Sequence, residues 1–234
     1  MAGRRLGRAL LGSGLLGVTL LGGAGGYGLG LLTTGEQASA GTAATPLTGT
    51  SAAPTTPPTA APKPIVPDNS KPLRAKDIEY KIRSFTVRDA LESAVSVRVP
   101  GDWQLSVPPD TEKYMRYNEP ARKRWIRIEA GFTVQRSPAL SMAARIDLLQ
   151  DLPATQRLTI MTHSVDPKTQ DATLLYSYVP DRTLRYVIVR WVADPAGLCH
   201  FEIAVTGLPQ DQPALEVILD HAAKSATRSD SPLN

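Results

Sequence analysis

The sequence has very few of the residues that build covalent cross-links or metal centres. Its 234 residues include one cysteine, Cys199, so an intrachain disulfide is impossible and a cysteine-based metal site is not expected. Cys199 also lies far beyond the hydrophobic N-terminal run, whereas a lipid-modified cysteine would follow that run directly. The three histidines, His163, His200 and His221, show no short-range spacing typical of metal ligands. We therefore expect neither a metal nor another cofactor.

The sequence also lacks the short motifs of the common enzyme classes. The part expected to fold contains no G-x-S-x-G, no H-E-x-x-H, no P-loop and no G-x-G-x-x-G after a strand. This absence favours a non-enzymatic protein without excluding an enzyme.

Net charge is missing from the folded part as well. Of the 26 basic and 22 acidic residues, six basic and two acidic ones lie in residues 1–74, so 20 of each sign remain in the rest. The basic isoelectric point of about 9.3 therefore comes from the N-terminal part of the chain. Because binding to nucleic acid needs a cationic surface, this balance argues against a nucleic-acid partner.

The N-terminus has the pattern of a membrane segment. Residues 1–8 are a basic tail, and residues 9–32 contain no charged side chain. As a helix this run would be roughly 36 Å long, enough to cross a hydrocarbon core of about 30 Å. We expect a transmembrane or signal-anchor helix whose basic end stays in the cytoplasm, so that the rest of the chain faces outward. Residues 38–40 read Ala-Ser-Ala, and the alternative is cleavage after Ala40 with secretion.

Residues 33–75 are dominated by Ala, Thr, Pro, Gly and Ser. Such a stretch has too little apolar surface to offset the entropy of ordering, so we expect a disordered linker. An extracytoplasmic domain is expected over residues 76–228, with a short tail at residues 229–234.

The domain sequence alternates between strand and helix patterns. A hydroxyl at Ser137 followed by Pro138 predicts the start of a helix to residue 152, and an apolar stripe predicts a second helix over residues 212–226. Period-2 alternation and short apolar runs predict the strands: residues 77–87, 94–99, 124–132, 157–165, 173–179, 185–192 and 198–206. Trp103 and Trp191 are expected in the core. This order predicts an α+β fold, an antiparallel sheet of about six to seven strands with helices packed on it.

Three local features carry a resemblance to a known family. Residues 99–103 read Val-Pro-Gly-Asp-Trp at a strand end, a helix opens at Ser137-Pro138, and a strand meander leads into a C-terminal helix. This combination resembles the PsbP-like α/β/α sandwich, in particular LpqN-type and other actinobacterial membrane-anchored extracytoplasmic domains, over residues 77–228. The resemblance implies a domain of the cell envelope. The chain departs from LpqN-type proteins in lacking their lipid-attachment cysteine.

The candidate binding residues are aromatic and cationic side chains gathered within 14 residues. They are Tyr114, Tyr117, Arg122, Arg124, Trp125 and Arg127. Such a mixture holds anionic or glycan partners through stacking and charge. The alternative is that Trp125 anchors the loop to the core while the basic residues pair with nearby glutamates.

We therefore expect a membrane-tethered, non-enzymatic binding or accessory domain, whose partner is an envelope protein or a glycan. The alternative is an envelope enzyme or small-ligand carrier with a groove near Tyr176, Tyr178, His200 and Glu202. Strand alternation places His200 and Glu202 on one face, opposite Cys199, where they could meet as an acid/base pair. The simpler interpretation of that face is a solvated polar surface.

Overall fold

The structure of the protein is a computed structural model that describes residues 64–106 and 112–233. The hydrophobic segment 9–32, the linker residues 33–63 and the Ala-Ser-Ala sequence lie outside these residues. In the described part, no helix has the length and apolar character needed to cross a membrane.

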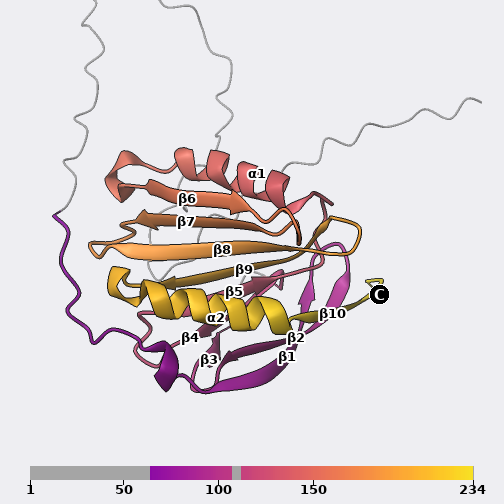
Figure 1. Cartoon of the computed structure of the whole chain (residues 1–234), viewed down its shortest axis with the longest axis horizontal. Helices are drawn as coiled ribbons and strands as arrows, with labels where there is room; N and C mark the ends of the chain where they lie inside the picture. Colours follow the sequence, from indigo (N-terminus) through magenta and orange to yellow (C-terminus); the bar gives the residue numbers. More distant parts are fainter. Residues whose placement is uncertain (1–63, 107–111, 234) are drawn as a thin grey trace, which may run out of the picture. The chain divides into compact units, whose positions relative to one another are not determined.

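Two antiparallel sheets and two α-helices form the described part (Figure 1). The larger sheet has seven strands in the order β3-β4-β5-β9-β8-β7-β6, and the smaller has three in the order β1-β2-β10. The strands are β1 (Tyr80–Arg88), β2 (Glu92–Pro100), β3 (Gln104–Ser106), β4 (Tyr114–Asn118), β5 (Trp125–Glu129), β6 (Thr159–Val165), β7 (Ala172–Tyr178), β8 (Arg185–Ala193), β9 (Cys199–Gly207) and β10 (Thr227–Ser231). The helices are α1 (Pro138–Gln150), α2 (Gln212–Ser225) and the 3-10 turns η1 (Ala75–Asp77), η2 (Ala154–Gln156) and η3 (Pro209–Asp211).

Helix α1 covers one face of the large sheet and begins where the sequence predicts. The Leu140 N–H donates to the Ser137 hydroxyl at 3.3 Å, and Pro138 occupies the first turn. Met142 and Leu149 are buried against β7 and β8. Helix capping and apolar spacing therefore position this helix as expected.

Helix α2 and the small sheet cover the opposite face of the large sheet. The predicted stripe of α2 is fully buried: Leu215, Ile218, Leu219 and Ala222. It packs with the inward valines of β2 and with the inner residues of β5 and β9. The predicted α+β class is thus confirmed, with the strands divided between two sheets rather than gathered in the single sheet expected.

Three strands were not expected from the sequence. The structure forms β3 and β4 in the stretch predicted as a polar loop before residue 124, and β10 extends to Ser231, past the predicted end of the domain. Strand β10 reads Thr-Arg-Ser-Asp-Ser and has no apolar alternation; it exists because its backbone pairs with β2. The pairing partner of such a strand is not encoded in its own pattern.

Part of the predicted linker lies on the domain, and we call residues 66–74 the N-terminal strap. The Val66 N–H donates to the Arg182 carbonyl at 2.7 Å, and the Leu73 N–H donates to the Asp211 carboxylate at 2.8 Å. The Lys123 ammonium lies 3.0 Å from Asp68. The folded part therefore begins upstream of residue 76, because side chains far along the chain bind the strap.

A buried ion pair between Arg124 and Asp211 joins three parts of the chain. The two side chains form a two-pronged pair, with Nε–Oδ2 at 2.6 Å and Nη2–Oδ1 at 2.9 Å, and Asp211 is fully buried. Arg124 also donates to the Lys71 carbonyl, and Asp211 accepts the Leu208 N–H as well as that of Leu73. The pair thus connects the strap, the start of β5 and the turn that opens α2.

We expect Arg124→Ala to lower the free energy of unfolding by about 3–5 kcal/mol, because it leaves the Asp211 carboxylate buried without its cation. Urea denaturation of the full chain measures the loss. Arg122→Ala is the matched control: Arg122 is exposed in the adjoining turn, and its replacement should change stability by less than about 0.5 kcal/mol. Equal losses in the two variants would contradict the role assigned to the pair.

Candidate functional site

The six aromatic and cationic residues predicted as a binding cluster lie in three different environments. Tyr114, Trp125 and Arg127 are partly buried on the α1 side of β4 and β5. Tyr117 points to the other side and is 3% exposed in the core. Arg124 is buried in its pair with Asp211, and Arg122 occupies an exposed turn with φ of 55°. Because successive strand residues point to opposite faces, closeness in sequence did not make one site.

The three residues that remain together are engaged within the chain. The Arg127 guanidinium lies 5.2 Å from the centre of the Tyr114 ring, and that of Arg185 lies 6.0 Å from the Trp125 ring. These are cation–π distances. Of the cations expected to meet a partner, Arg127 therefore stacks on an aromatic ring of its own domain, and Trp125 is stacked by Arg185, which was not among them.

An ion cluster on the α1 side of the large sheet is centred on Glu202. Arg127 from β5 and Arg145 from α1 both donate to its Oε1, the latter at 2.7 Å. The indole N–H of Trp191 donates to Oε2 at 2.9 Å. Glu202 is 6% exposed, so three donors from three elements satisfy a nearly buried carboxylate.

Two carboxyl groups in this cluster have opposite pKa shifts. Burial alone would raise the pKa of Glu202, but the charges of Arg145 and Arg127 lower it below its ordinary value. Burial and the negative charge of Glu202 raise the pKa of Glu129, which faces Arg127 at 3.5 Å. The cluster thus keeps Glu202 ionised and favours the protonated form of its neighbour.

The alternative in which His200 pairs with Glu202 does not form. The register of β9 with β8 shifts between Val192 and Ala193, and this bulge lets Cys199 pack in the core on the same side as Glu202. The His200 ring instead lies edge-on to Phe201, at 4.6 Å between ring centres. Tyr176 and Tyr178 are buried under α1 at 2% and 3% exposure. The structure therefore does not gather these four residues around a groove.

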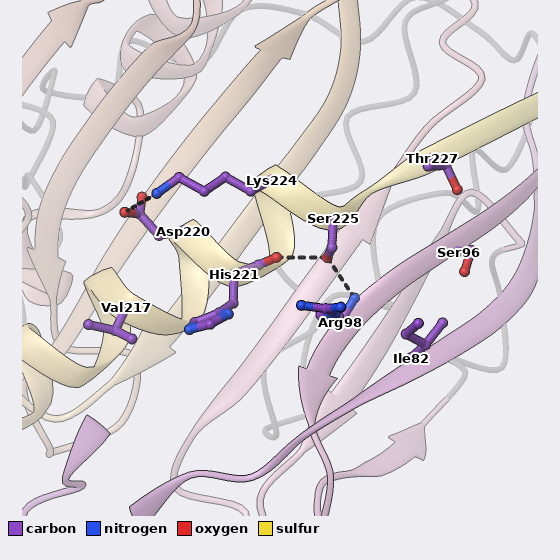
Figure 2. Close-up of a pocket in the computed structure, with 9 residues that line it drawn as sticks. All are labelled: Ile82, Ser96, Arg98, Val217, Asp220, His221, Lys224, Ser225 and Thr227. Atoms are coloured by element: carbon purple, nitrogen blue, oxygen red, sulfur yellow. Dashed lines mark hydrogen bonds and ion pairs between the residues drawn. The ribbon is translucent and has the colours of Figure 1, made fainter. Parts of the chain in front are cut away.

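A groove between helix α2 and the outer face of the small sheet forms a concave site (Figure 2). We call it the α2–β2 groove, and its volume is about 670 Å³. Figure 2 shows side chains from α2 on one side and from β1 and β2 on the other. They are Ile82, Ser96, Arg98, Val217, Asp220, His221, Lys224, Ser225 and Thr227.

The α2–β2 groove combines basic, hydroxyl and apolar groups. Its basic groups are Arg98, His221 and Lys224, and its single carboxylate, Asp220, is held by Arg190 at 2.6 Å and by Lys224 at 3.4 Å. Ile82 is 64% exposed and, with Val217, supplies the apolar surface of the groove. Charge and apolar surface together favour a ligand that has an anionic group beside an apolar one.

Local contacts hold two walls of the groove in place. The His221 ring stacks on Tyr80 with 4.1 Å between ring centres. The backbone N–H of Arg98 donates to the Ser225 hydroxyl at 2.9 Å, and that hydroxyl donates to the backbone carbonyl of His221 at 2.7 Å (Figure 2). Helix α2 is therefore bonded directly to β2 at the floor of the groove.

The sequence did not reveal this groove. The alternation of residues 77–87 places Ile78, Tyr80 and Ile82 on one face of the strand. Ile78 and Tyr80 pack against the core, whereas Ile82 is exposed. On α2, an apolar Val217 falls four residues before His221 on the polar side of the helix. An apolar residue on the polar side of a helix is the one sign of the groove that the sequence contains.

A second groove, of about 550 Å³, lies on the other side of Asp220 and Lys224. Its carboxylates are used within the chain: Asp166 accepts the N–H groups of Lys168 and Thr169, and Asp171 accepts that of Ala193. Among the described residues, no three His, Cys, Asp or Glu side chains are grouped to hold a metal ion. The α2–β2 groove is thus the better candidate site.

Comparisons with known proteins found similar chains among solved structures alone. The sequence matches no protein-family model and no curated protein. Among solved structures, the domain is similar to the Ran-binding protein Mog1p of Saccharomyces cerevisiae, with 13% identity and a TM-score of 0.43, covering 63% of this chain and 96% of that one. It is also similar to LpqN of Mycobacterium tuberculosis, described as involved in cell envelope biogenesis, with 16% identity and a TM-score of 0.39, covering 66% and 94%.

LpqN is of the type that the sequence motifs resemble. At these TM-scores neither likeness carries an argument about what the chain binds.

We expect Glu202→Gln to lower the free energy of unfolding at pH 7 by about 3 kcal/mol, because Arg127 and Arg145 lose their shared anion. Glu129→Gln replaces a carboxyl whose ionised form is disfavoured, and should cost less than about 1 kcal/mol. Urea denaturation of both variants measures the difference, and a larger loss for Glu129→Gln would contradict the assignment of charges.

The opposite pKa shifts of Glu129 and Glu202 predict that the stability of the protein depends on pH. Glu129 binds its proton more tightly in the folded protein than in the unfolded chain, so its contribution to stability falls as the pH rises from the ordinary value of 4.5 through the raised pKa. Glu129→Gln should remove this fall while leaving the loss of stability at lower pH that comes from protonating Glu202. A variant whose pH profile matches the wild type would contradict the raised pKa.

Proposed function

We propose that this chain is a non-catalytic binding or accessory domain of the cell envelope, held on the outer side of the membrane by residues 9–32, and that it holds its partner in the α2–β2 groove. The observation that carries the proposal is the exposure of Ile82 beside Arg98, His221 and Lys224 in a concave site. An exposed aliphatic side chain set in a hollow among cations offers a partner both apolar contact and charge.

The ion cluster around Glu202 supports a binding role over a catalytic one. An acid/base catalyst needs a titratable group within reach of a substrate proton. Glu202 is nearly buried and already accepts bonds from Arg127, Arg145 and Trp191. Its carboxylate oxygens are already hydrogen-bonded, and these bonds join α1 to the large sheet.

The partner that fits best is an acidic peptide segment of another envelope protein. A volume of about 670 Å³ accommodates a few residues of a peptide. Carboxylates of such a segment would lie near Arg98 and Lys224, while one apolar side chain would cover Ile82 and Val217. A domain at the end of a long linker reaches partners away from its own membrane surface.

Site-specific photocrosslinking tests this proposal in cells that produce the full chain. A photoreactive residue at Val217 should give a discrete adduct, and Arg98→Glu combined with Lys224→Glu should reduce its yield about tenfold, because two cations that face the acidic segment become repulsive. The same residue at Leu140, which is 61% exposed on α1, should not give this adduct.

Lys76→Glu combined with Arg122→Glu is the matched charge control, because it changes the net charge equally at exposed positions that do not line the groove. This control should leave the adduct unchanged. An adduct that persists in the Arg98 and Lys224 double variant, or is lost equally in both, would overturn the proposal.

A further inference from the structure

Strand β6 forms one edge of the large sheet and is exposed along almost its whole length. Six of its seven residues are exposed, and Ile160 is the exception. Within the described ranges, β7 is the strand that pairs with it, and the sheet order ends at β6. Figure 1 shows β6 as the outermost strand of the large sheet. Its outer backbone groups are therefore available to another strand.

The other terminal strands carry the features that discourage edge pairing, whereas β6 carries few. Strand β3 has three residues, β1 carries Lys81, Arg83 and Arg88, and β10 is short and carries both signs of charge. No charged residue and no proline occurs in residues 158–165. One register shift, between Ile160 and Thr162, is the only irregularity recorded in the pairing of β6. Exposed Met161 and Val165 add apolar surface to this edge.

We propose that β6 pairs with β6 of a second copy of this chain, antiparallel about a twofold axis near Thr162. A twofold contact uses one surface twice, so the strand must complement itself. An uncharged strand meets no repulsion from its own copy, and Thr162 would face its counterpart across the axis, a favourable cross-strand pair.

The charges at the two ends of β6 complement each other in this arrangement. Arg157 precedes the strand and Asp166 follows it, and both are exposed. Antiparallel pairing brings the Arg157 end of one copy beside the Asp166 end of the other, twice per dimer. The backbone N–H groups of Lys168 and Thr169 lower the pKa of Asp166, so this carboxylate stays ionised. Parallel pairing, or pairing with a strand flanked by other charges, would not have this match.

The pairing would join two large sheets edge to edge and give each assembly two α2–β2 grooves. It does not depend on the proposed function, because the groove is built by α2 and the small sheet whereas β6 lies at the edge of the large one.

Disulfide crosslinking of the full chain in the cells that produce it tests the proposal. Thr162→Cys should give a disulfide-linked dimer under mild oxidation, because the two positions face each other near the axis. Gln104→Cys, on the exposed terminal strand β3, is the matched control and should crosslink at least about tenfold less. The native Cys199 should not interfere, since burial raises the pKa of its thiol to about 12.

Sedimentation of the full chain in detergent gives a second measurement. Thr162→Lys places two positive charges at the axis and should raise the dimer dissociation constant at least about tenfold, whereas Gln104→Lys should leave it unchanged. Circular dichroism and thermal unfolding should show both variants folded. Three results would each overturn the proposal: equal crosslinking of the Thr162→Cys and Gln104→Cys variants, a monomer at all concentrations, or a Thr162→Cys variant that crosslinks to a different protein.

Discussion

The buried pair of Arg124 and Asp211 is the constraint on which the rest of this domain depends. Asp211 immediately precedes α2, so the pair fixes where that helix starts, and Arg124 fixes the entry of β5 into the large sheet. The same two side chains bind backbone groups of the strap. Because Asp211 is fully buried, removing Arg124 would leave its carboxylate without a cation. One salt bridge thereby ties three segments that are distant in the sequence.

The position of α2 in turn determines what the surface offers. Its inner stripe is fully buried in the core, and Val217, His221 and Lys224 on its flank face β1 and β2. The α2–β2 groove is the space left between them, with Ile82 exposed in it and basic side chains around it. On the opposite face of the large sheet, the charges around Glu202 are satisfied by one another. The domain thus separates structural charges, which are paired inside, from those that face outward.

The elements that the sequence predicted well are those with a local cause. A capping hydroxyl and a proline start α1 at the expected residue, and the stripe of α2 is buried as its spacing indicates. Trp103 and Trp191 are in the core. Strand β10 was not predicted because its five residues are polar. It is a strand because its backbone pairs with that of β2.

The residues of the candidate sites are separated for a different reason. The predicted aromatic and cationic cluster assumed that neighbours in sequence are neighbours in space, but strand alternation sent Tyr117 and Trp125 to opposite faces. The alternative pairing of His200 with Glu202 required regular alternation along β9, and one bulge in that strand interrupts the alternation. A single inserted residue reverses the face of every side chain on one side of it.

The sequence by itself determined the α+β class, both helices, most strands, and the balance of charge in the folded part, because each follows from local spacing or from composition. Only the tertiary structure decided which charges pair, that the strap belongs to the domain, and that Ile82 lies in a groove rather than in the core. Those outcomes depend on contacts between residues far apart in the sequence, such as Arg124 with Asp211, 87 positions apart, and Leu73 with Asp211, 138 positions apart. Hydrophobic periodicity and secondary-structure propensity depend on residues that are close along the chain. The burial of a side chain depends on the distant residues that the fold packs against it.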